Sequence, residues 1–217
     1  TESFLMPLLA YLLQDLSRYT DVKTAVNNTG PHTPGIGPKR GTRELDNGNY
    51  VFSNDVLQRN NENRPTAIKA MIIYPMNALV EDQLTRLRIA MDSDRIRSYC
   101  DQNLNGNRIF FGRYNGSSPV AGSLTKTKDG GTECNKSKWH SLVKELKSIQ
   151  FNLDQIISFA EAEGIEGADR DELLANFQRL DGAEMRSRFD MQQTPPDILI
   201  TNFSMLSIML MREIESS

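Results

Sequence analysis

Small and polar residues follow three short apolar runs of the sequence, and they are of the kinds that contact phosphate groups. The runs end in Tyr74-Pro75-Met76-Asn77, in Gly112-Arg113-Tyr114-Asn115-Gly116 and in Thr201-Asn202-Phe203-Ser204. Arginine pairs with phosphate, glycine lets a backbone approach a ligand closely, and the N–H groups at the beginning of a helix attract anions. Three such segments at one edge of a sheet would form a track for a phosphate backbone that reads no bases.

Each of these residues also has a purely structural interpretation. Asn77 can cap a helix, Gly112 and Gly116 are typical turn residues, and a tyrosine such as Tyr114 more often packs than stacks on a base. Arg113 alone is more often solvated than bound to a ligand, and Thr201-Asn202 can simply begin a helix. The order of the three segments along the chain, rather than any one residue, therefore indicates a binding edge.

The elements that must position these segments are strands alternating with helices. Short apolar runs over 69–74, 108–111 and 197–200 are typical of buried parallel strands. Apolar residues at helical spacing predict helices over 2–18, 77–91, 139–163, 172–189 and 205–211, with Pro7 kinking the first or marking an early turn. This alternation predicts an α/β fold, a parallel sheet with helices on both faces, and ligands of such sheets bind beyond the carboxyl ends of the strands.

Two long stretches interrupt the pattern. The first is rich in Gly, Pro and Asn, and the second separates the second and third strands, with residues 117–138 reading as loop. A structureless loop of such length is unusual inside a compact domain, so we predict one domain over 1–217 with insertions at about 20–66 and 118–192. The helices of the second insertion either pack on their own sheet or contact a partner.

Composition excludes several classes of protein. The chain has 217 residues, with 25 basic and 28 acidic side chains, so its net charge of −3 is not that of a polybasic arm. Its apolar stretches end well before the ~18 residues of a transmembrane helix, so no membrane partner is expected. Cys100 and Cys134 form no disulfide framework and, with two histidines, no zinc spacing, which indicates a reduced, cytoplasmic protein. The chain opens at Thr1 inside an apolar helical pattern, as a piece of a larger protein would.

Taken in order, the segments resemble the first RecA-like domain of a superfamily 2 DEAD/DEAH-type helicase. The resemblance lies in four blocks: TESFLMPLL (1–9) is similar to the end of the phosphate-binding loop, YPMNALVEDQLTRLR (74–88) to motif Ia, GRYNG (112–116) to the glycine-containing motif, and DILITNFSML (197–206) to the strand before the acidic motif. The Thr-Asn-x-x-Met-Leu form resembles DNA repair helicases and large anti-phage defence helicases of the Druantia or DISARM type.

The resemblance implies a role for each block. Thr1 would bind Mg²⁺ beside the ATP phosphates, and Glu2 would bond within the same loop. The nucleic-acid track would consist of Pro75, Met76, Asn77, Gln83, Gly112, Arg113, Tyr114, Gly116, Thr201 and Asn202. Its partners would be single-stranded DNA, a second RecA-like domain of the same protein and other proteins of a defence complex. The phosphate-loop lysine and the acidic pair are absent, so no catalytic residue is expected in this chain and no ATP hydrolysis by the chain alone.

Two other functions fit the same residues. A helicase-like fold could serve as a catalytically inactive module that binds nucleic acid or a protein partner. A Rossmann-like nucleotide-binding domain is the third possibility, although no Gly-x-Gly-x-x-Gly follows a strand. An intact Gly-Lys upstream and an acidic pair downstream would distinguish the motor from the binding module.

Overall fold

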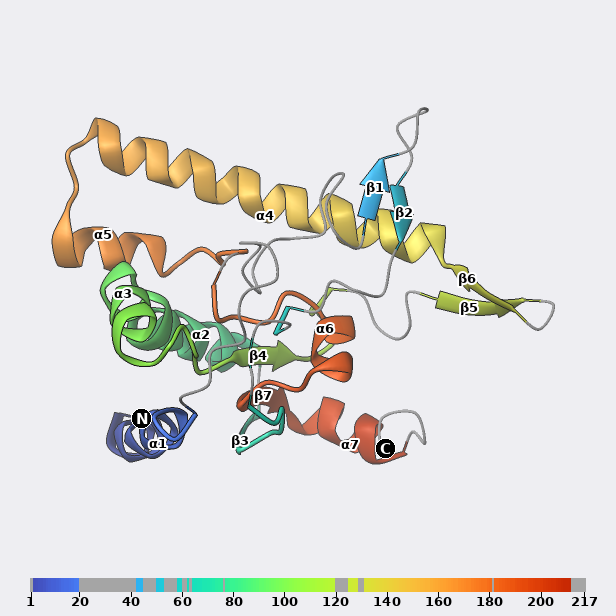
Figure 1. The fold of residues 1–217 in the computed structure, drawn as a ribbon, viewed down its shortest axis with the longest axis horizontal. Helices are drawn as coiled ribbons and strands as arrows, with labels where there is room; N and C mark the ends of the chain where they lie inside the picture. The colour runs from blue at the N-terminus through green and yellow to red at the C-terminus, as the bar shows by residue number, and fades with distance from the viewer. Residues whose placement is uncertain are drawn as a thin grey trace.

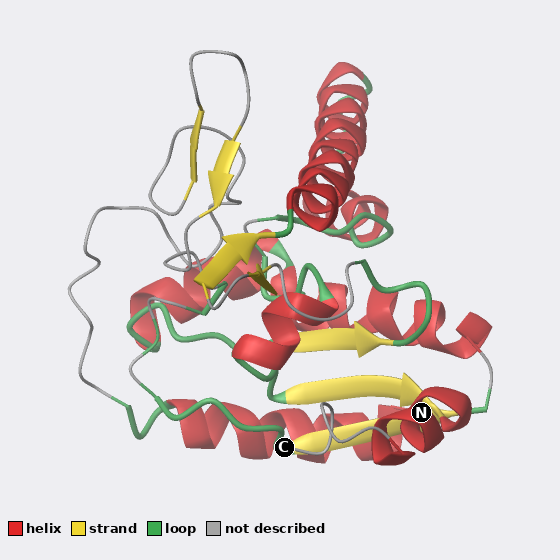
Figure 2. Cartoon of the chain, turned by 90° about the vertical axis from the view of Figure 1, so that its right-hand side faces the viewer, coloured by secondary structure: helices red, strands yellow, loops and turns green. Residues whose placement is uncertain are grey.

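The computed structural model describes residues 2–19, 42–44, 50–52, 58–59, 62, 64–75, 77–119, 125–128, 131–180 and 182–211. A three-stranded parallel sheet lies at its centre, made of β3 (Ala70–Tyr74), β7 (Ile198–Asn202) and β4 (Phe111–Tyr114) in the order β3-β7-β4 (Figure 1). Figure 2 shows the three strands side by side with helices around them. The predicted α/β fold with a parallel sheet is therefore confirmed.

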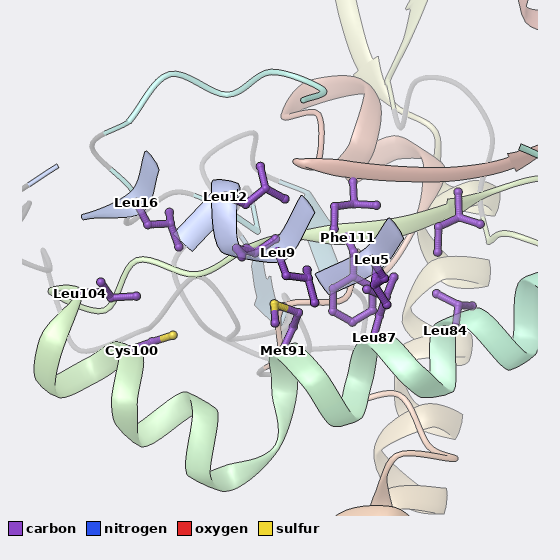
Figure 3. Close-up of a cluster of buried hydrophobic side chains, with 14 of the residues drawn as sticks. Leu5, Leu9, Leu12, Leu16, Leu84, Leu87, Met91, Cys100, Leu104 and Phe111 are labelled. Atoms are coloured by element: carbon purple, nitrogen blue, oxygen red, sulfur yellow. The ribbon is translucent and has the colours of Figure 1, made fainter. Parts of the chain in front are cut away.

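Three helices cover the first face of this sheet: α1 (Glu2–Leu16), α2 (Asn77–Asp92) and α3 (Asp94–Asn103). Helix α1 runs unbroken through Pro7. Alternate strand residues such as Ile198 and Ile200 meet the apolar stripes of the helices in one core, as period-2 and period-3.6 patterns require (Figure 3). The buried helical residues of this core are Leu5, Leu9, Leu12, Leu16, Val80, Leu84, Leu87, Met91 and Cys100.

The second face of the sheet is covered by α6 (Arg188–Gln193) and α7 (Phe203–Met211). Its core consists of Phe110, Tyr114, Met185, Met191, Leu199 and Met205. Helices therefore lie on both faces, as a sheet buried on both sides requires. In the described residues, no helix is both long and apolar enough to cross a membrane.

The strand predicted over 108–111 is wrong by three residues, since β4 begins only at Phe111. The Phe110 carbonyl accepts from the Ile198 amide of β7 at 3.0 Å, but the backbone before it is bound by buried charged side chains. The Arg108 amide donates to the Glu62 carboxylate, 3.3 Å away, and the Arg108 carbonyl accepts from the Arg64 guanidinium at 2.6 Å. Apolar composition alone could not reveal these competing partners.

The helix predicted over 172–189 is also wrong. The structure has a short α5 (Gly167–Leu174), then irregular backbone, then α6. The Phe111 amide donates to the Ala183 carbonyl at 3.1 Å, and the Met185 amide donates to the Phe111 carbonyl at 2.8 Å. The segment from Gly182 to Ser187 is buried beside β4. It does not form a helix, because the backbone groups that would close helical turns are bonded to the strand instead.

The stretch predicted as loop over 117–138 contains an antiparallel hairpin, β5 (Thr125–Lys128) and β6 (Gly131–Cys134). Its threonines around an Asp-Gly pair are a hairpin signal that explains the difference. Helix α4 (Lys136–Ala162) follows, and the first long stretch contains a second antiparallel pair, β1 (Thr42–Glu44) and β2 (Tyr50–Phe52). The two insertion boundaries stay predictions, and the residues of the second stretch from 182 onward pack against the central sheet.

A mostly buried network of ion pairs lies at the edge of the sheet where the three strands begin. We call it the amino-edge network; it consists of Asp15, Arg59, Glu62, Arg64, Lys69 and Asp197. Three cationic and three anionic side chains balance one another, as buried charges must. The hydrogen bond from Lys69 lowers the pKa of Asp15. Asp15 lies in the last turn of α1 and Lys69 directly precedes β3, so the end of α1 lies beside the beginning of the strands. Helix α1 therefore runs antiparallel to the strands and begins near the carboxyl ends of the strands.

Candidate nucleic-acid interface

The carboxyl ends of the three strands lie next to one another. The parallel register pairs Tyr74 with Asn202 and Tyr114 with Thr201, so the residues that follow each strand emerge at one edge. Pro75 is exposed there, and α2 and α7 begin directly beyond β3 and β7. The edge that the sequence predicted therefore exists, with two helix N-termini beside it.

The loop after β4 is held in one shape by its own side chains. The Asn115 carboxamide oxygen accepts from the Ser117 amide at 3.1 Å, and the Asn115 amide donates to the Ser118 hydroxyl at 3.1 Å. The Ser118 hydroxyl in turn donates to the Arg113 carbonyl. Gly116 and Ser117 are left exposed at the tip, so this loop offers a preformed surface to a ligand.

Arg113 faces α2 and carries the main positive charge of the edge. Its guanidinium donates to the carboxylate of Glu81 on α2. The Arg113 side chain is 24% exposed and that of Glu81 is 55% exposed. Glu81 therefore occupies the Arg113 guanidinium, and the pair contributes no net charge to the edge.

Thr201 and Tyr114 connect strand ends to one another. The Thr201 hydroxyl donates to the Tyr114 carbonyl at 2.7 Å, and both residues are buried. The Tyr114 hydroxyl accepts from the Gln192 amide at 2.8 Å, and the Arg188 guanidinium lies 5.9 Å from the ring centroid. In this arrangement both side chains hold the edge together, and their predicted contact with nucleic acid stays a prediction.

Gln83 lies inside the core beneath the edge. Its carboxamide oxygen accepts from the Tyr74 hydroxyl at 2.8 Å, while its buried nitrogen has no partner in the described part of the chain. Burial raises the pKa of Tyr74, which keeps the hydroxyl protonated as a donor. The Tyr74–Gln83 bond thus fixes α2 on β3 and positions the beginning of α2.

Asn202 caps the helix that follows β7. Its side-chain oxygen accepts from the Met205 amide at 2.7 Å, which is the N-cap geometry. The next residue, Phe203, is 60% exposed, and Ser204 is also exposed. Sequence reasoning did not single out Phe203, although an aromatic residue between the polar residues of a strand end is a signal for it. Exposed aromatic rings are where nucleic-acid bases stack.

Gly112 turns into the core rather than toward the edge. A methyl group in place of its Cα hydrogen would lie 2.6 Å from the Met191 sulfur and 2.9 Å from Met185 Cβ. Gly116, by contrast, has open space around it. The two glycines therefore have different roles: Gly112 permits close packing of the segments on the second face, and only Gly116 lies where a ligand could approach.

We predict that Gly112→Ala lowers the free energy of unfolding by about 1 to 3 kcal/mol, because overpacking must displace Met185. Gly116→Ala is the matched control and should change stability by less than about 1 kcal/mol. Urea unfolding followed by circular dichroism measures both. Equal stabilities of the two variants would contradict the packing role of Gly112.

Some of the predicted site lies outside the described residues. These are Thr1 and Met76, together with the side chains of Glu2 and Asn77, which begin α1 and α2. Within the described ranges, no group of three acidic, histidine or cysteine side chains could hold a metal ion. The predicted ATP and Mg²⁺ contacts of Thr1 and Glu2 therefore stay predictions.

An open parallel sheet with helices on both faces and polar loops beyond the strand ends defines an α/β domain, a class whose ligands commonly bind at that edge. The chain is similar to Druantia protein DruE of Escherichia coli (strain UMEA 4076-1), with 31% identity in an alignment of 172 positions that covers 68% of this chain. The aligned part is only 9% of the length of that protein. No family model and no solved structure matches the chain. The Druantia part of the resemblance is thus supported, and membership of helicase superfamily 2 stays a prediction.

Proposed function

We propose that this chain provides the nucleic-acid-binding edge of an ATP-dependent DNA helicase or translocase in an anti-phage defence system. The observation that carries the proposal is the parallel register of β3, β7 and β4, which sets three strand ends and two helix N-termini side by side. The similarity to a Druantia protein supports the defence setting. Other proteins of that system are the partners we propose.

The exposed groups of the edge suit a phosphate backbone and a stacked base. Helix α7 begins at Phe203, and its first amide groups favour a phosphate. The Phe203 ring offers a stacking surface, and Arg113 offers a guanidinium that can leave Glu81 for a phosphate. Such contacts predict binding of single-stranded DNA with weak sequence preference.

ATP and Mg²⁺ enter the proposal through the resemblance of residues 1–9 to the end of a phosphate-binding loop. The structure adds that α1 begins on the carboxyl side of the sheet, where a phosphate-binding loop would have to lie. A second RecA-like domain of the same protein would close onto this edge and move the strand along it. Closure and reopening would be coupled to hydrolysis.

The experiment that tests the proposed function is ATP hydrolysis by the full-length protein, with and without single-stranded DNA. We expect hydrolysis that DNA stimulates several-fold. Absence of hydrolysis by the folded protein would reject the motor and favour a binding module instead.

Phe203→Ala tests the edge itself. We expect it to weaken binding of a labelled single-stranded oligonucleotide by about five- to a hundredfold, because one stacked base contributes about 1 to 3 kcal/mol. Tyr99→Ala is the matched control, since Tyr99 is an exposed aromatic residue on α3, away from the edge. Fluorescence anisotropy measures both affinities, and equal affinities for the two variants would argue against the edge as a binding surface.

A further inference from the structure

Helix α4 presents a basic and aromatic stripe to solvent. Its apolar residues Leu142, Leu146, Leu153 and Ala160 are buried on one side. His140, Lys144, Lys147 and Phe151 follow one another at spacings of four, three and four residues, so they share the opposite side, and all four are exposed. We call these four residues the α4 stripe; it extends over about 16 Å of helix.

Phe151 has no packing role that would explain its position. It is 63% exposed in the middle of a helix whose other large apolar residues mostly face inward. Single exposed apolar residues are common on protein surfaces, but this one continues a line of basic side chains one turn further along. The combination of lysines and an aromatic ring is the one that binds nucleic-acid strands, with phosphates on the charges and a base on the ring.

The basic residues of α4 lie in its first half, where the helix dipole disfavours positive charge. Residues 136–147 contain four lysines and one glutamate, whereas residues 148–162, the rest of the helix, contain two acidic residues and no lysine or arginine. A helix is stabilised by acidic residues at its beginning and basic residues at its end, and α4 has neither in those turns. The helix dipole therefore does not account for the lysines in the first half of α4, whereas a role in binding a polyanion would.

The basic half of α4 lies on a different side of the molecule from the carboxyl edge of the sheet. Figure 1 shows that α4 begins next to the β5–β6 hairpin and runs back toward α5. In Figure 2, α4 points toward the viewer above the sheet, while the strands run across the view with their arrowheads to the right. The α4 stripe and the sheet edge are therefore two separate surfaces.

We propose that the α4 stripe binds a single-stranded nucleic acid, with Lys144 and Lys147 on phosphates, Phe151 stacked on a base and His140 at the end of the path. The exposed ring favours a single strand over duplex DNA, whose bases are already stacked. It also favours nucleic acid over an acidic protein, which would need the charges alone. The stripe is separate from the sheet-edge loops, so the inference extends the proposed function without depending on it.

Two variants of the full-length protein test the stripe in anisotropy titrations with a labelled single-stranded oligonucleotide. Phe151→Ala should weaken binding by about five- to a hundredfold at every salt concentration. The double variant Lys144→Gln, Lys147→Gln should reduce the slope of log affinity against log salt by about 1.4, because each phosphate contact on a single strand contributes about 0.7.

Matched controls separate these effects from general ones. Phe159→Ala removes the other exposed phenylalanine of α4, which lies about 80° around the helix from Phe151. Arg18→Gln, Arg95→Gln removes the same charge from exposed positions on other elements. Both controls should bind DNA as the unchanged protein does.

Three outcomes would overturn the inference: stripe variants that behave as the controls do, a duplex that binds better than the single strand, or polyglutamate that competes as well as DNA. Loss of binding in the stripe variants but not in Phe203→Ala would keep this inference and reject the sheet edge. The reverse result would do the opposite. Because all the changed side chains are exposed, thermal unfolding should be the same in every variant.

Discussion

Asp197→Asn is expected to lower the free energy of unfolding by about 3 to 5 kcal/mol, since it leaves buried cations without their partner. The Asp197 carboxylate accepts two hydrogen bonds of 2.5 Å from the Arg64 guanidinium, lies 3.6 Å from Arg59, and accepts from the Phe110 amide at 2.9 Å. Its side chain is 1% exposed. Urea unfolding near pH 7 measures the loss.

The same substitution in an exposed ion pair is the control for Asp197→Asn. Asp82 pairs with Arg86 one turn along α2, and their side chains are 61% and 40% exposed. Asp82→Asn should therefore cost no more than about 0.5 kcal/mol. A small loss in both variants would show that the amino-edge network does not hold the fold.

The amino-edge network also explains why part of the fold escaped prediction. Arg59, Glu62 and Arg64 belong to a run rich in Asn and Arg, whose residue types are those of a loop, although both arginines pair with Glu62. The other partner of Arg64 lies 133 residues further along the chain. Burial alone would lower the pKa of Arg64, but the hydrogen bond with Asp197 and the charge of Glu62 raise it. Composition cannot distinguish such a buried charged segment from a solvated one.

The sheet was predictable because its strands are short apolar runs between helical patterns. Their ends were less predictable, since the backbone before Phe111 is bound by side chains of the amino-edge network and the ladder starts late. The segment from Gly182 to Ser187 reads as helix by its residue types. It is extended because Ala183 and Met185 are bonded to the backbone of Phe111. In both places a tertiary contact outweighed a local preference.

The sequence predicted which residues follow the strands at the candidate edge, but not the directions in which their side chains point. Along β4 the side chains alternate between the two faces, so Arg113 turns toward α2 while Gly112 and Tyr114 turn toward Met191 and α6. A sequence does not say which face of a sheet is covered by what. For the same reason the exposure of Phe203 could not be foreseen, because it depends on how α7 leaves β7.

The two proposed surfaces complement each other electrostatically. At the sheet edge, the charge of Arg113 is balanced by Glu81, so binding there rests on backbone amides and stacking. The α4 stripe, by contrast, has exposed lysines. If both surfaces contact one strand, most of the salt dependence of binding should come from α4 and little from the edge.

The second large effect is a loss of stability as pH rises, caused by Asp92 at the end of α2. Asp92 is 3% exposed; one carboxylate oxygen accepts from the Ala183 amide at 3.0 Å, and the other has no hydrogen-bond partner among the described residues. Burial raises the pKa of Asp92 to about 7, although Arg97, Arg179 and Arg108 oppose the shift. Because the ionised form is penalised only in the folded state, the stability that protonated Asp92 contributes is fully present below the ordinary pKa of an aspartate. That contribution is lost as pH rises through 7.

Between pH 5 and pH 8 the loss should be roughly 2 to 3 kcal/mol, from the difference between the two pKa values. Asp92→Asn keeps the shape of the protonated side chain and cannot ionise. Between pH 5 and pH 8 the variant should therefore lose less stability than the unchanged protein does, and the difference should equal that amount. Asp94→Asn, two residues away and with its carboxylate 53% exposed, should keep the full pH dependence. Urea unfolding at four pH values measures all three proteins, and equal slopes for Asp92→Asn and the unchanged protein would exclude Asp92 as the cause. Since Asp92 joins the end of α2 to Ala183, ionisation would loosen the irregular segment beside β4 first.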